Sequence, residues 1–559
     1  MANTASTKSA RKRAKKTAGQ QRPAAETKTA APVATPVSHD VPERVWLIAM
    51  IAILLIAAVL RLYDLNLVPL HHDEGVNGNF LVRLVRQGEY AYDPENYHGP
   101  TLYYFAALIP WITRLLFGTA ARDHYGLTTF TIRLIPALFG LGTIALIFML
   151  RRRLGTIAVL SAGLLLAVSP GAVYLSRYFI HETQFVFFTL GIVVFGLRFY
   201  DTRNPTWLLL ASASAALLFA TKETAMISAG VLLIAFALTH VYRRLFRKAL
   251  APTSVKGRRP QESAFRRFLD DFGTTNLLIS AAIAIVVFLF LNILFYSSFF
   301  THSQGIYDAL KTFEVWSKTG KTAHVHPPFT YALWLFRQEG SLLFLGVIGA
   351  VLVVLKPKNS MALFAALWSF GLIAAYSLIP YKTPWLALNF IVPLALIAGY
   401  VIQVIWELER GQIRIVAIMF LIAVGVSTYQ MIDLNFINYD NDSAYYVYVY
   451  AHTRRGTLDL VRNIEQIARE RDGDQTGITI VSPDYWPLPW YLRDYSHTAY
   501  FGQMSQSTEP LIVAREDQKA LMDANFGELY RMVPSNDASG SFELRPGVRL
   551  LLYVRRNRL

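Results

Sequence analysis

Residues 45–62 read VWLIAMIAILLIAAVLRL, an apolar run in which Arg61 is the one charged residue. An α-helix needs about 20 predominantly apolar residues to cross a bilayer, and this run is long enough. Similar runs recur along the chain, in which 53% of the 559 residues are hydrophobic and 16% are charged. Soluble domains carry roughly 25% charged residues. The sequence therefore predicts a polytopic α-helical membrane protein.

Eleven apolar runs are separated by arginine, lysine or proline, and we interpret each run as a transmembrane helix. They cover approximately residues 45–62, 130–150, 156–173, 183–200, 206–221, 224–241, 276–297, 341–355, 361–379, 386–406 and 412–431. The apolar stretch Thr101–Phe117 is shorter and contains Pro110 and Arg114. If it crossed the membrane, every later loop would change sides. We therefore expect it to lie at the outer interface.

The charge of the loops orients the predicted helices. With the N-terminal tail inside, the inner loops are mostly basic, and they lie at residues 151–153, 198–203, 242–272, 356–358 and 407–414. This agrees with the excess of Lys and Arg in cytoplasmic loops. Residues 1–42 lack a long apolar run and are predicted to be a disordered basic cytoplasmic tail. The tail is either solvated or bound to anionic lipid, and we expect the protein in the plasma membrane.

Composition also excludes several classes of function. The chain contains no cysteine, which rules out a thiolate nucleophile, a thiolate metal ligand and disulfides on the outer face. The net charge of +16 sits mostly in the tail and the short loops. The membrane surface explains this charge better than nucleic acid does. The absence of a Walker motif argues against ATP-driven pumping.

Three long segments are then expected on the outer face. Two of them, residues 64–129 and 298–340, interrupt the membrane domain of residues 43–432, and the third is residues 433–559. The third segment holds one helical stretch and three strand-like runs, at Thr457–Arg469, Ile478–Val481, Leu511–Val513 and Arg549–Val554. Strands alternating with helix indicate a small extracytoplasmic α/β domain.

The first outer segment concentrates acids, imidazoles and aromatic residues. It reads LHHDEGVNG at residues 70–78 and YAYDPENYHGPT at residues 90–101. Asp73 and Glu74 are adjacent, so on a helix their side chains point about 100° apart and would have different roles. One can act as a base, for which a carboxylate is suited, while the other holds a ligand, a metal or a neighbouring helix.

The ordered set of motifs resembles the GT-C membrane glycosyltransferases, and within them the protein-mannosyltransferase and aminoarabinose-transferase branch. The motifs are HDEG at 72–75, YDP at 92–94, YHGP at 97–100, RLIPALFG at 133–140, YKTPW at 381–385 and PLPWYLR at 487–493. They are similar also to a prokaryotic group associated with the flipping of lipid-linked glycans. The resemblance extends from Val45 to about Arg493.

The resemblance implies transfer of a sugar from a polyprenyl-phosphate donor to a glycan, lipid or protein acceptor on the outer face. It implies that Asp73 is the general base and that Glu74 is a companion that holds the loop or a helix. In the aminoarabinose-transferase branch an acid and a lysine precede a proline in this segment, whereas His98 and Gly99 precede Pro100 here. His98 is therefore a candidate replacement for the lost ligand.

The alternative function is a non-catalytic or transport-type component that assists the flipping of lipid-linked glycans. Such a component would use the same cavity and basic groups without a catalytic base. The sequence shows no inverted repeat of discontinuous helices, which weakens the case for a carrier. The outer acid pair favours the enzyme.

Other polar and aromatic residues are candidates for substrate binding. They are Asp93, Tyr97, Arg177, Glu182, Lys222, Lys382, Trp490 and Arg493. For Arg177, Glu182 and Lys222 there are two alternatives to substrate binding. In the first, the Lys222 side chain extends to water at the interface. In the second, a structural ion pair forms, either Arg177–Glu223 or Lys222–Glu182. Lys382 lies between two prolines and is a candidate to hold the lipid phosphate, with an interface anchor as the alternative.

Two further features complete the predicted site. His72, Asp73 and His98 form a candidate site for a divalent metal, and His324 with His326 forms a weaker one. The segment Tyr485–Arg493 is too aromatic for a free surface loop. We expect it to pack over the membrane cavity and to shape the acceptor site, the alternative being a core turn of the α/β domain.

Overall fold

The computed structural model describes residues 41–556, except residues 96–97, 251–263, 320–323, 408–409, 536 and 538. The predicted cytoplasmic tail therefore lies almost entirely outside the described residues. The described part belongs to one compact unit, Val37–Leu559.

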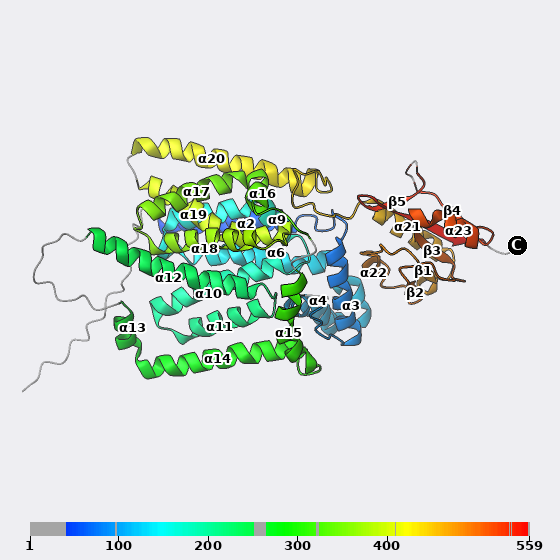
Figure 1. The fold of residues 1–559 in the computed structure, drawn as a ribbon, viewed down its shortest axis with the longest axis horizontal. Coiled ribbons are helices and arrows are strands. Elements are labelled where there is room, and N and C mark those ends of the chain that lie inside the picture. The colour runs from blue at the N-terminus through cyan, green and yellow to red at the C-terminus, as the bar shows by residue number, and fades with distance from the viewer. Residues whose placement is uncertain are drawn as a thin grey trace, which may run out of the picture. The chain divides into compact units, whose positions relative to one another are not determined.

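Long apolar helices run side by side and make up most of the structure (Figure 1). The helices that precede the C-terminal sheet are α2 (Glu43–Leu62), α3 (His72–Gln87), α4 (Thr101–Phe117), α5 (Thr119–Ala121), α6 (Thr129–Phe148), α7 (Arg151–Leu154), α8 (Thr156–Ala167), α9 (Pro170–Ser176), α10 (Glu182–Thr202), α11 (Pro205–Phe219), α12 (Ala225–Leu250), α13 (Ala264–Phe272), α14 (Thr274–Tyr296), α15 (Gln304–Thr319), α16 (Thr330–Gln338), α17 (Gly340–Leu355), α18 (Ser360–Leu378), α19 (Leu388–Trp406) and α20 (Arg410–Ile432).

The predicted class, a multi-pass helical membrane protein, is confirmed, and each of the eleven predicted runs coincides with a helix. The number of spans is not confirmed. Eight described helices are long and apolar enough to cross a membrane. Two more spans result if the bent pairs α8–α9 and α16–α17 each count as one, with bends of 63° and 115°. Helix α11 has 15 residues and is shorter than a full span requires.

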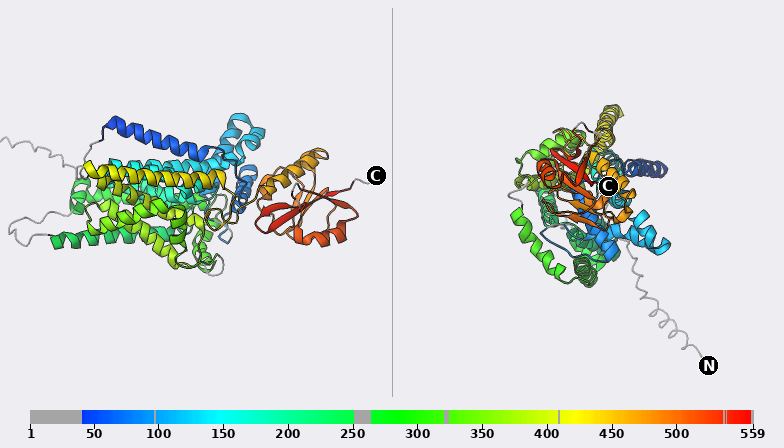
Figure 2. Two further views of the ribbon diagram at one scale, coloured as in Figure 1. Left: turned by 90° about the horizontal axis from the view of Figure 1, so that it is seen from above. Right: turned by 90° about the vertical axis from the view of Figure 1, so that its right-hand side faces the viewer.

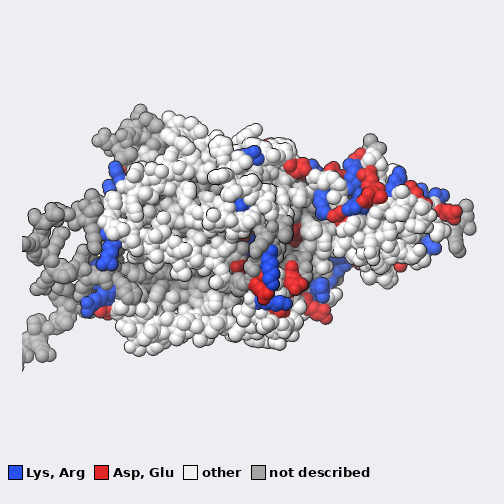
Figure 3. Space-filling model, in the orientation of Figure 1, with Lys and Arg blue, Asp and Glu red and all other residues white. Residues whose placement is uncertain are grey.

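The loops predicted to be cytoplasmic gather at one end of the bundle. Asn359 Nδ2 donates to Arg153 O over 2.7 Å, and Arg153 forms an ion pair with Asp201. Arg151 Nη1 lies 2.8 Å from Glu43 Oε2, at the start of α2. Figure 3 shows Lys and Arg at this end, few charges along the middle, and mixed charges at the other end. The two ends are thus segregated as the loop charges predict, and the identity of the cytoplasmic side stays a prediction.

The opposite end of the bundle carries α3 and α15, which run across the direction of the long helices (Figure 1). Helix α4 packs against α3. Its first residues are buried, whereas Leu115 and Phe117 near its end are 84% and 73% exposed. With 17 residues α4 is shorter than the candidate spans, in agreement with an interfacial helix.

The C-terminal part of the chain forms a mixed sheet with helices, as predicted (Figure 2). Its elements are α21 (Gly456–Arg469), β1 (Ile478–Ile480), α22 (Leu488–Tyr491), β2 (Thr498–Tyr500), β3 (Leu511–Arg515), α23 (Lys519–Phe526), β4 (Tyr530–Val533), β5 (Phe542–Arg545) and β6 (Val548–Arg555). The strand order is β2-β1-β3-β6-β4, and β5 also pairs with β6. Strand β1 is parallel to β2 and β3, whereas β6 is antiparallel to its neighbours.

The predicted helix and the three predicted strands of this domain are confirmed. The sequence missed β2, β4 and β5, which have only three or four residues each, too few for a repeated pattern to stand out. The boundary at residue 433 stays a prediction.

Candidate functional site

Helix α3 begins with a capping box that fixes the position of Asp73. The backbone N–H of Asp73 donates to His71 Nδ1 over 3.1 Å, and the N–H of His71 donates to Glu74 Oε2 over 3.0 Å. His71 Nε2 lies 2.9 Å from the Tyr450 carbonyl oxygen, which can only accept. Nε2 therefore carries the proton, and Nδ1 is free to cap the helix.

The side chain of Asp73 is accessible. It is 41% exposed, and its Oδ2 lies 3.8 Å from His71 Nδ1. Within the described part of the chain, no hydrogen bond to this carboxylate is found. Burial raises the pKa of the Tyr178 hydroxyl, and the Asp73 charge raises it further, so this phenol lies within electrostatic reach of the carboxylate.

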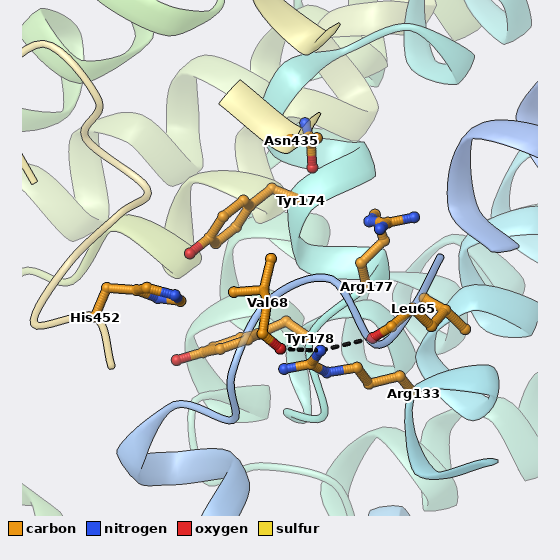
Figure 4. A pocket seen from close by; sticks show the side chains of 8 residues that line it. All are labelled: Leu65, Val68, Arg133, Tyr174, Arg177, Tyr178, Asn435 and His452. Carbon is orange, nitrogen blue, oxygen red and sulfur yellow. Dashed lines mark hydrogen bonds between the residues drawn. The ribbon is translucent and has the colours of Figure 1, made fainter. Parts of the chain in front are cut away.

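Glu74, by contrast, is fully buried. Its carboxylate accepts hydrogen bonds from Arg133 Nε and Nη2, over 2.7 and 2.6 Å. It also accepts from the Phe179 N–H over 2.8 Å and from the His71 N–H. Arg133 also donates to backbone carbonyls in residues 65–69, two of which Figure 4 shows. Glu74 thus ties α3, α6 and two loops together. This geometry fits the holding role expected for it and leaves no open face for catalysis.

Two ion pairs form a second polar cluster at the same end of the bundle. His98 Nδ1 lies 2.9 Å from Glu223 Oε2, and Lys222 Nζ lies 2.5 Å from Glu182 Oε1. Burial would raise the pKa of Glu223, but the His98 and Lys222 charges outweigh it and lower that pKa. Burial would lower the pKa of Lys222, but the two carboxylates raise it. Of the two structural ion pairs considered from the sequence, the structure contains Lys222–Glu182.

The second half of the first outer segment docks directly on this cluster. The Gly99 N–H donates to the Thr221 carbonyl over 3.0 Å, and the buried His181 Nε2 donates to the Gly99 carbonyl over 3.0 Å. The His98 ring stacks on Trp316 of α15 at 5.3 Å between centroids. His98 therefore lies between Glu223 and Trp316, in a position that its sequence neighbours alone do not reveal.

Tyr381 lies within reach of both polar groups. Burial raises the pKa of its hydroxyl, Lys222 lowers it, and the carboxylates of Asp73, Glu182 and Glu223 raise it. The Tyr381 hydroxyl is therefore subject to the charges of Asp73 and of the second cluster, which are separated by more than 100 residues in sequence. In the sequence, Tyr381 stands out only as part of the YKTPW motif at residues 381–385.

Lys382 follows Tyr381 and is buried. Its Nζ donates to the carbonyls of Ile379 and His326 over 2.5 and 3.3 Å. Burial lowers the pKa of this ammonium group. An ammonium group has three donors, and the described residues provide no third acceptor or acidic partner. One N–H of Lys382 therefore has no acceptor among the described residues.

Arg177 has a different environment from the one expected. Its guanidinium donates to the carbonyls of Leu60, Tyr63 and Asp64 over 3.2, 2.5 and 2.8 Å. Burial, helped by the Arg133 charge, lowers its pKa to about 10. Arg177 closes the C-terminal end of α2, and the expected pair with Glu223 is not among the described contacts.

The remaining residues of the first outer segment are less informative. Asp93 Oδ1 accepts from the Glu95 N–H over 2.9 Å, which forms a local turn. Tyr97 lies outside the described residues.

A small cavity lies beside Arg133 (Figure 4). It is lined by Leu65, Val68, Arg133, Tyr174, Arg177, Tyr178, Asn435 and His452. It has room for about one water molecule and is too small for a sugar. Both ring nitrogens of the buried His452 lack a hydrogen-bond partner in the described protein, so water in this cavity is the available partner.

The predicted metal ligands are not brought together. His98 pairs with Glu223, and Asp73 lies beside His71. Among the described residues, no group of three His, Asp or Glu side chains is placed to hold a metal ion. The residues present therefore do not fit the metal site that the sequence predicted at His72, Asp73 and His98.

The aromatic segment of the C-terminal domain packs on α3, and its predicted role in shaping the acceptor site stays a prediction. A Cβ at Gly78 would lie 2.6 Å from the Trp490 ring, and one at Gly75 would lie 2.5 Å from Pro487. The two glycines thus allow the aromatic segment to approach α3 closely. Tyr491 Oη accepts from the Leu70 N–H over 2.8 Å. The segment therefore braces the helix that carries Asp73.

Trp490 and Arg493, expected to bind substrate, take part in this packing. Trp490 is 1% exposed. The Arg493 guanidinium stacks on the Trp490 ring at 4.4 Å and donates from Nη2 to the Leu127 carbonyl over 2.8 Å.

Comparisons with known proteins agree with this architecture. Residues 105–255 match the family model described as dolichyl-phosphate-mannose-protein mannosyltransferase. A search of the curated proteins finds no match. Among solved structures, ArnT from Cupriavidus metallidurans bound to undecaprenyl phosphate is similar, with 15% identity and a TM-score of 0.55. The match covers 91% of this chain and 98% of that chain.

Two structures of the oligosaccharyltransferase from Archaeoglobus fulgidus are also similar. One is tethered with an acceptor peptide, with 14% identity, a TM-score of 0.51, and coverage of 89% of this chain and 74% of that chain. The other is a complex with Zn and sulfate, with 13% identity, a TM-score of 0.50, and coverage of 89% and 73%. The chain therefore has the fold of these membrane proteins, and residues 105–255 match the mannosyltransferase family model.

Proposed function

We propose that this protein transfers a sugar from a polyprenyl-phosphate-linked donor to an acceptor hydroxyl or amide, with Asp73 as the general base. The fold supports glycosyl transfer, since similar structures contain undecaprenyl phosphate in one case and an acceptor peptide in another. We place the reaction at the end of the bundle that carries α3, which the loop charges make the outer end.

The different environments of two adjacent acids carry the proposal. Glu74 is buried and its carboxylate is fully hydrogen-bonded, whereas the Asp73 carboxylate is 41% exposed. A general base must reach the proton that it removes, and of the two only Asp73 can do so. Glu74 and His71 then act as positioning residues, because both hold the first turn of α3.

The reaction follows from this arrangement. Asp73 takes the proton of the acceptor, whose oxygen or nitrogen forms a bond to C1 of the sugar. The bond between C1 and the phosphate oxygen breaks, and polyprenyl phosphate leaves with the electron pair. The developing charge requires a cation. We assign this role to the N–H of Lys382 that has no acceptor among the described residues, with His98 as the second candidate, because Arg177 already binds three carbonyls.

No step is routed through a metal ion. The similar oligosaccharyltransferase was crystallised with Zn, but the described residues of this chain bring no three ligands together. Transfer activity of the purified protein, measured with a chelator and with added divalent cations, shows directly whether the reaction requires a metal ion.

Replacement of Asp73 by Asn tests the proposal, since the change removes the base and nearly keeps the shape. General-base catalysis contributes about 100- to 10,000-fold, so we expect transfer to slow by that factor. The measurement is release of polyprenyl phosphate from labelled donor, with donor binding measured alongside and expected to be retained. Glu95→Gln, at an exposed position of the same segment, is the matched control. Undiminished transfer by Asp73→Asn would remove Asp73 as the base, and no release of polyprenyl phosphate by the wild type would favour the component that assists glycan flipping.

A further inference from the structure

The carboxyl edge of strands β1 and β3 lies beside the proposed base. Strand β1 pairs in parallel with β2 on one side and with β3 on the other. The chain leaves β1 toward β2 and leaves β3 toward α23, so the two connections diverge at this edge. In open α/β sheets, ligands bind at the carboxyl ends of strands where the connections diverge. The topology therefore singles out this edge of the domain.

Three charged side chains form a network at the carboxyl edge. Asp484 follows β1, Arg515 ends β3 and Arg545 ends β5. Arg515 Nη1 lies 2.8 Å from Asp484 Oδ2, and Arg545 binds the other oxygen of the same carboxylate. These side chains are 23–34% exposed, so the network is held in place and is still reachable from solvent. Arg515 also binds both oxygens of Asp517 through Nε and Nη2, so two carboxylates and two guanidinium groups are held in a fixed arrangement.

An aromatic surface joins the network to α3. The rings of Tyr485 and Trp486 lie 5.6 Å apart, and both are half-buried. Trp486 lies 6.1 Å from the His72 ring, and Pro487 contacts Gly75. Trp486 is thus located between the charged network and the first turn of α3.

The electrostatics of His72 support this proximity. Burial lowers the pKa of the imidazole, the Asp73 and Asp484 charges raise it, and the Arg545 charge lowers it. One side chain of α3 therefore senses both the proposed base and the network of the C-terminal domain.

We propose that Trp486, Asp484, Arg515 and Arg545 form a carbohydrate-binding subsite that holds a sugar ring of the acceptor next to Asp73. The inference rests on the proposed function and names the acceptor as a glycan. An aromatic face packs against the C–H groups of a sugar ring, and carboxylate and guanidinium groups bind its hydroxyls. Asp484 and Asp517 balance the charges of Arg515 and Arg545, so the network does not favour an anion such as phosphate, and the exposed charges disfavour a purely apolar ligand.

Sugar binding by the purified full-length protein tests the subsite. The probes are methyl α-mannoside, methyl β-galactoside, methyl β-glucoside and methyl N-acetyl-β-glucosaminide, followed by saturation-transfer NMR. We expect at least one to bind, and Trp486→Ala to weaken that binding by about tenfold. Trp486→Phe keeps an aromatic face and should retain most of the binding. Trp406→Ala, at an exposed tryptophan of α19, should leave it unchanged.

The outcomes separate this subsite from the proposed function. Asp73→Asn should bind the sugars as the wild type does, even when transfer is lost. Failure of all four probes to bind, or equal binding by Trp486→Ala, would overturn the subsite and leave Asp73 to be judged by the transfer assay. Weaker binding of an acceptor peptide by Trp486→Ala, with unchanged sugar binding, would also overturn the subsite, in favour of a peptide acceptor. Thermal melting of each variant verifies that the domain is folded.

Discussion

At the residue scale, the pair Asp73–Glu74 shows how neighbours acquire opposite roles. Both are carboxylates in the first turn of α3, where a negative charge is favoured by the helix dipole. Only Glu74 faces Arg133, and the pair is 0% and 2% exposed. A buried ion pair of this kind holds elements in place, and its charge is not available to a substrate.

Loss of the Glu74 charge should therefore destabilise the protein. Glu74→Gln leaves the Arg133 guanidinium buried without a counter-charge, which costs about 3–5 kcal/mol. We expect a large drop in the thermal midpoint in detergent. Adding Arg133→Met to this variant should recover part of the loss, because the double variant buries no lone charge. A stable Glu74→Gln protein without transfer activity would instead assign Glu74 a direct catalytic role.

The buried imidazoles predict the response of stability to acid. Burial, helped by His71 and Arg133, lowers the pKa of His452 well below the ordinary value of 6.5. Below about pH 6.5 the unfolded chain takes up a proton that the folded protein excludes. The free energy of unfolding therefore decreases as the pH is lowered. One group contributes up to about 1.4 kcal/mol per pH unit. His181 contributes to the pH dependence of stability in the same direction, since burial lowers its pKa as well.

Thermal midpoints between pH 7.5 and 5.5 measure this effect. His452→Gln should flatten the dependence, because the titrating group is removed. His497→Gln, at an exposed position of the C-terminal domain, is the control and should follow the wild type. Identical slopes for His452→Gln and the wild type would show that His452 does not contribute.

At the element scale, the contact between α3 and α22 joins the C-terminal domain to the proposed base. Gly75 and Gly78 face the segment that contains Pro487 and Trp490, and neither position has room for a Cβ. The spacing of three residues places both glycines on one face of α3. The sequence signal was present as GVNG, but a pair of glycines in a helix does not reveal which partner approaches it.

Gly78→Ala should separate the two elements. The new Cβ would lie 2.6 Å from the Trp490 ring, and overpacking of this kind costs about 1–3 kcal/mol. We expect faster proteolysis of the linker at residues 443–455 and slower transfer. Gly196→Ala is the matched control, since a Cβ there meets no atom within 4 Å. Unchanged proteolysis and transfer in Gly78→Ala would show that the contact is dispensable.

At the scale of the whole molecule, the charges divide the two ends of the bundle. Lys and Arg lie together at one end, which includes the ion pairs of Arg151 and Arg153, and mixed charges lie at the other end (Figure 3). This division fits a bundle oriented by the excess of positive charge in cytoplasmic loops. On this basis we predict that the end with α3 is the outer end.

Single cysteines test that orientation, and the natural chain offers no background because it has none. Arg152→Cys should react with a membrane-impermeant maleimide only from the cytoplasmic side, and Arg462→Cys only from outside. Both positions are exposed, and the Arg462 side chain is 73% accessible. Reaction of Arg462→Cys from the cytoplasmic side would reverse the proposed topology. Lys256, also predicted to be cytoplasmic, lies outside the described residues.

The sequence by itself determined the class of fold, because the length of apolar runs and the charge of loops are local properties. It located a helix in all eleven predicted runs and found the principal strands of the C-terminal domain. It could not fix the number of spans, since the bends of 63° and 115° arise where helices pack around interruptions. It also pointed to Asp73 through the neighbouring acids and imidazoles.

Only the tertiary structure decided how the site is assembled. His98 pairs with Glu223 and not with Asp73, and Arg177 binds the end of α2. These choices depend on which loops meet at one end of the bundle, over separations of more than 100 residues. Burial then distinguishes groups that are chemically equal in the sequence, because it removes water from Glu74 and leaves Asp73 accessible.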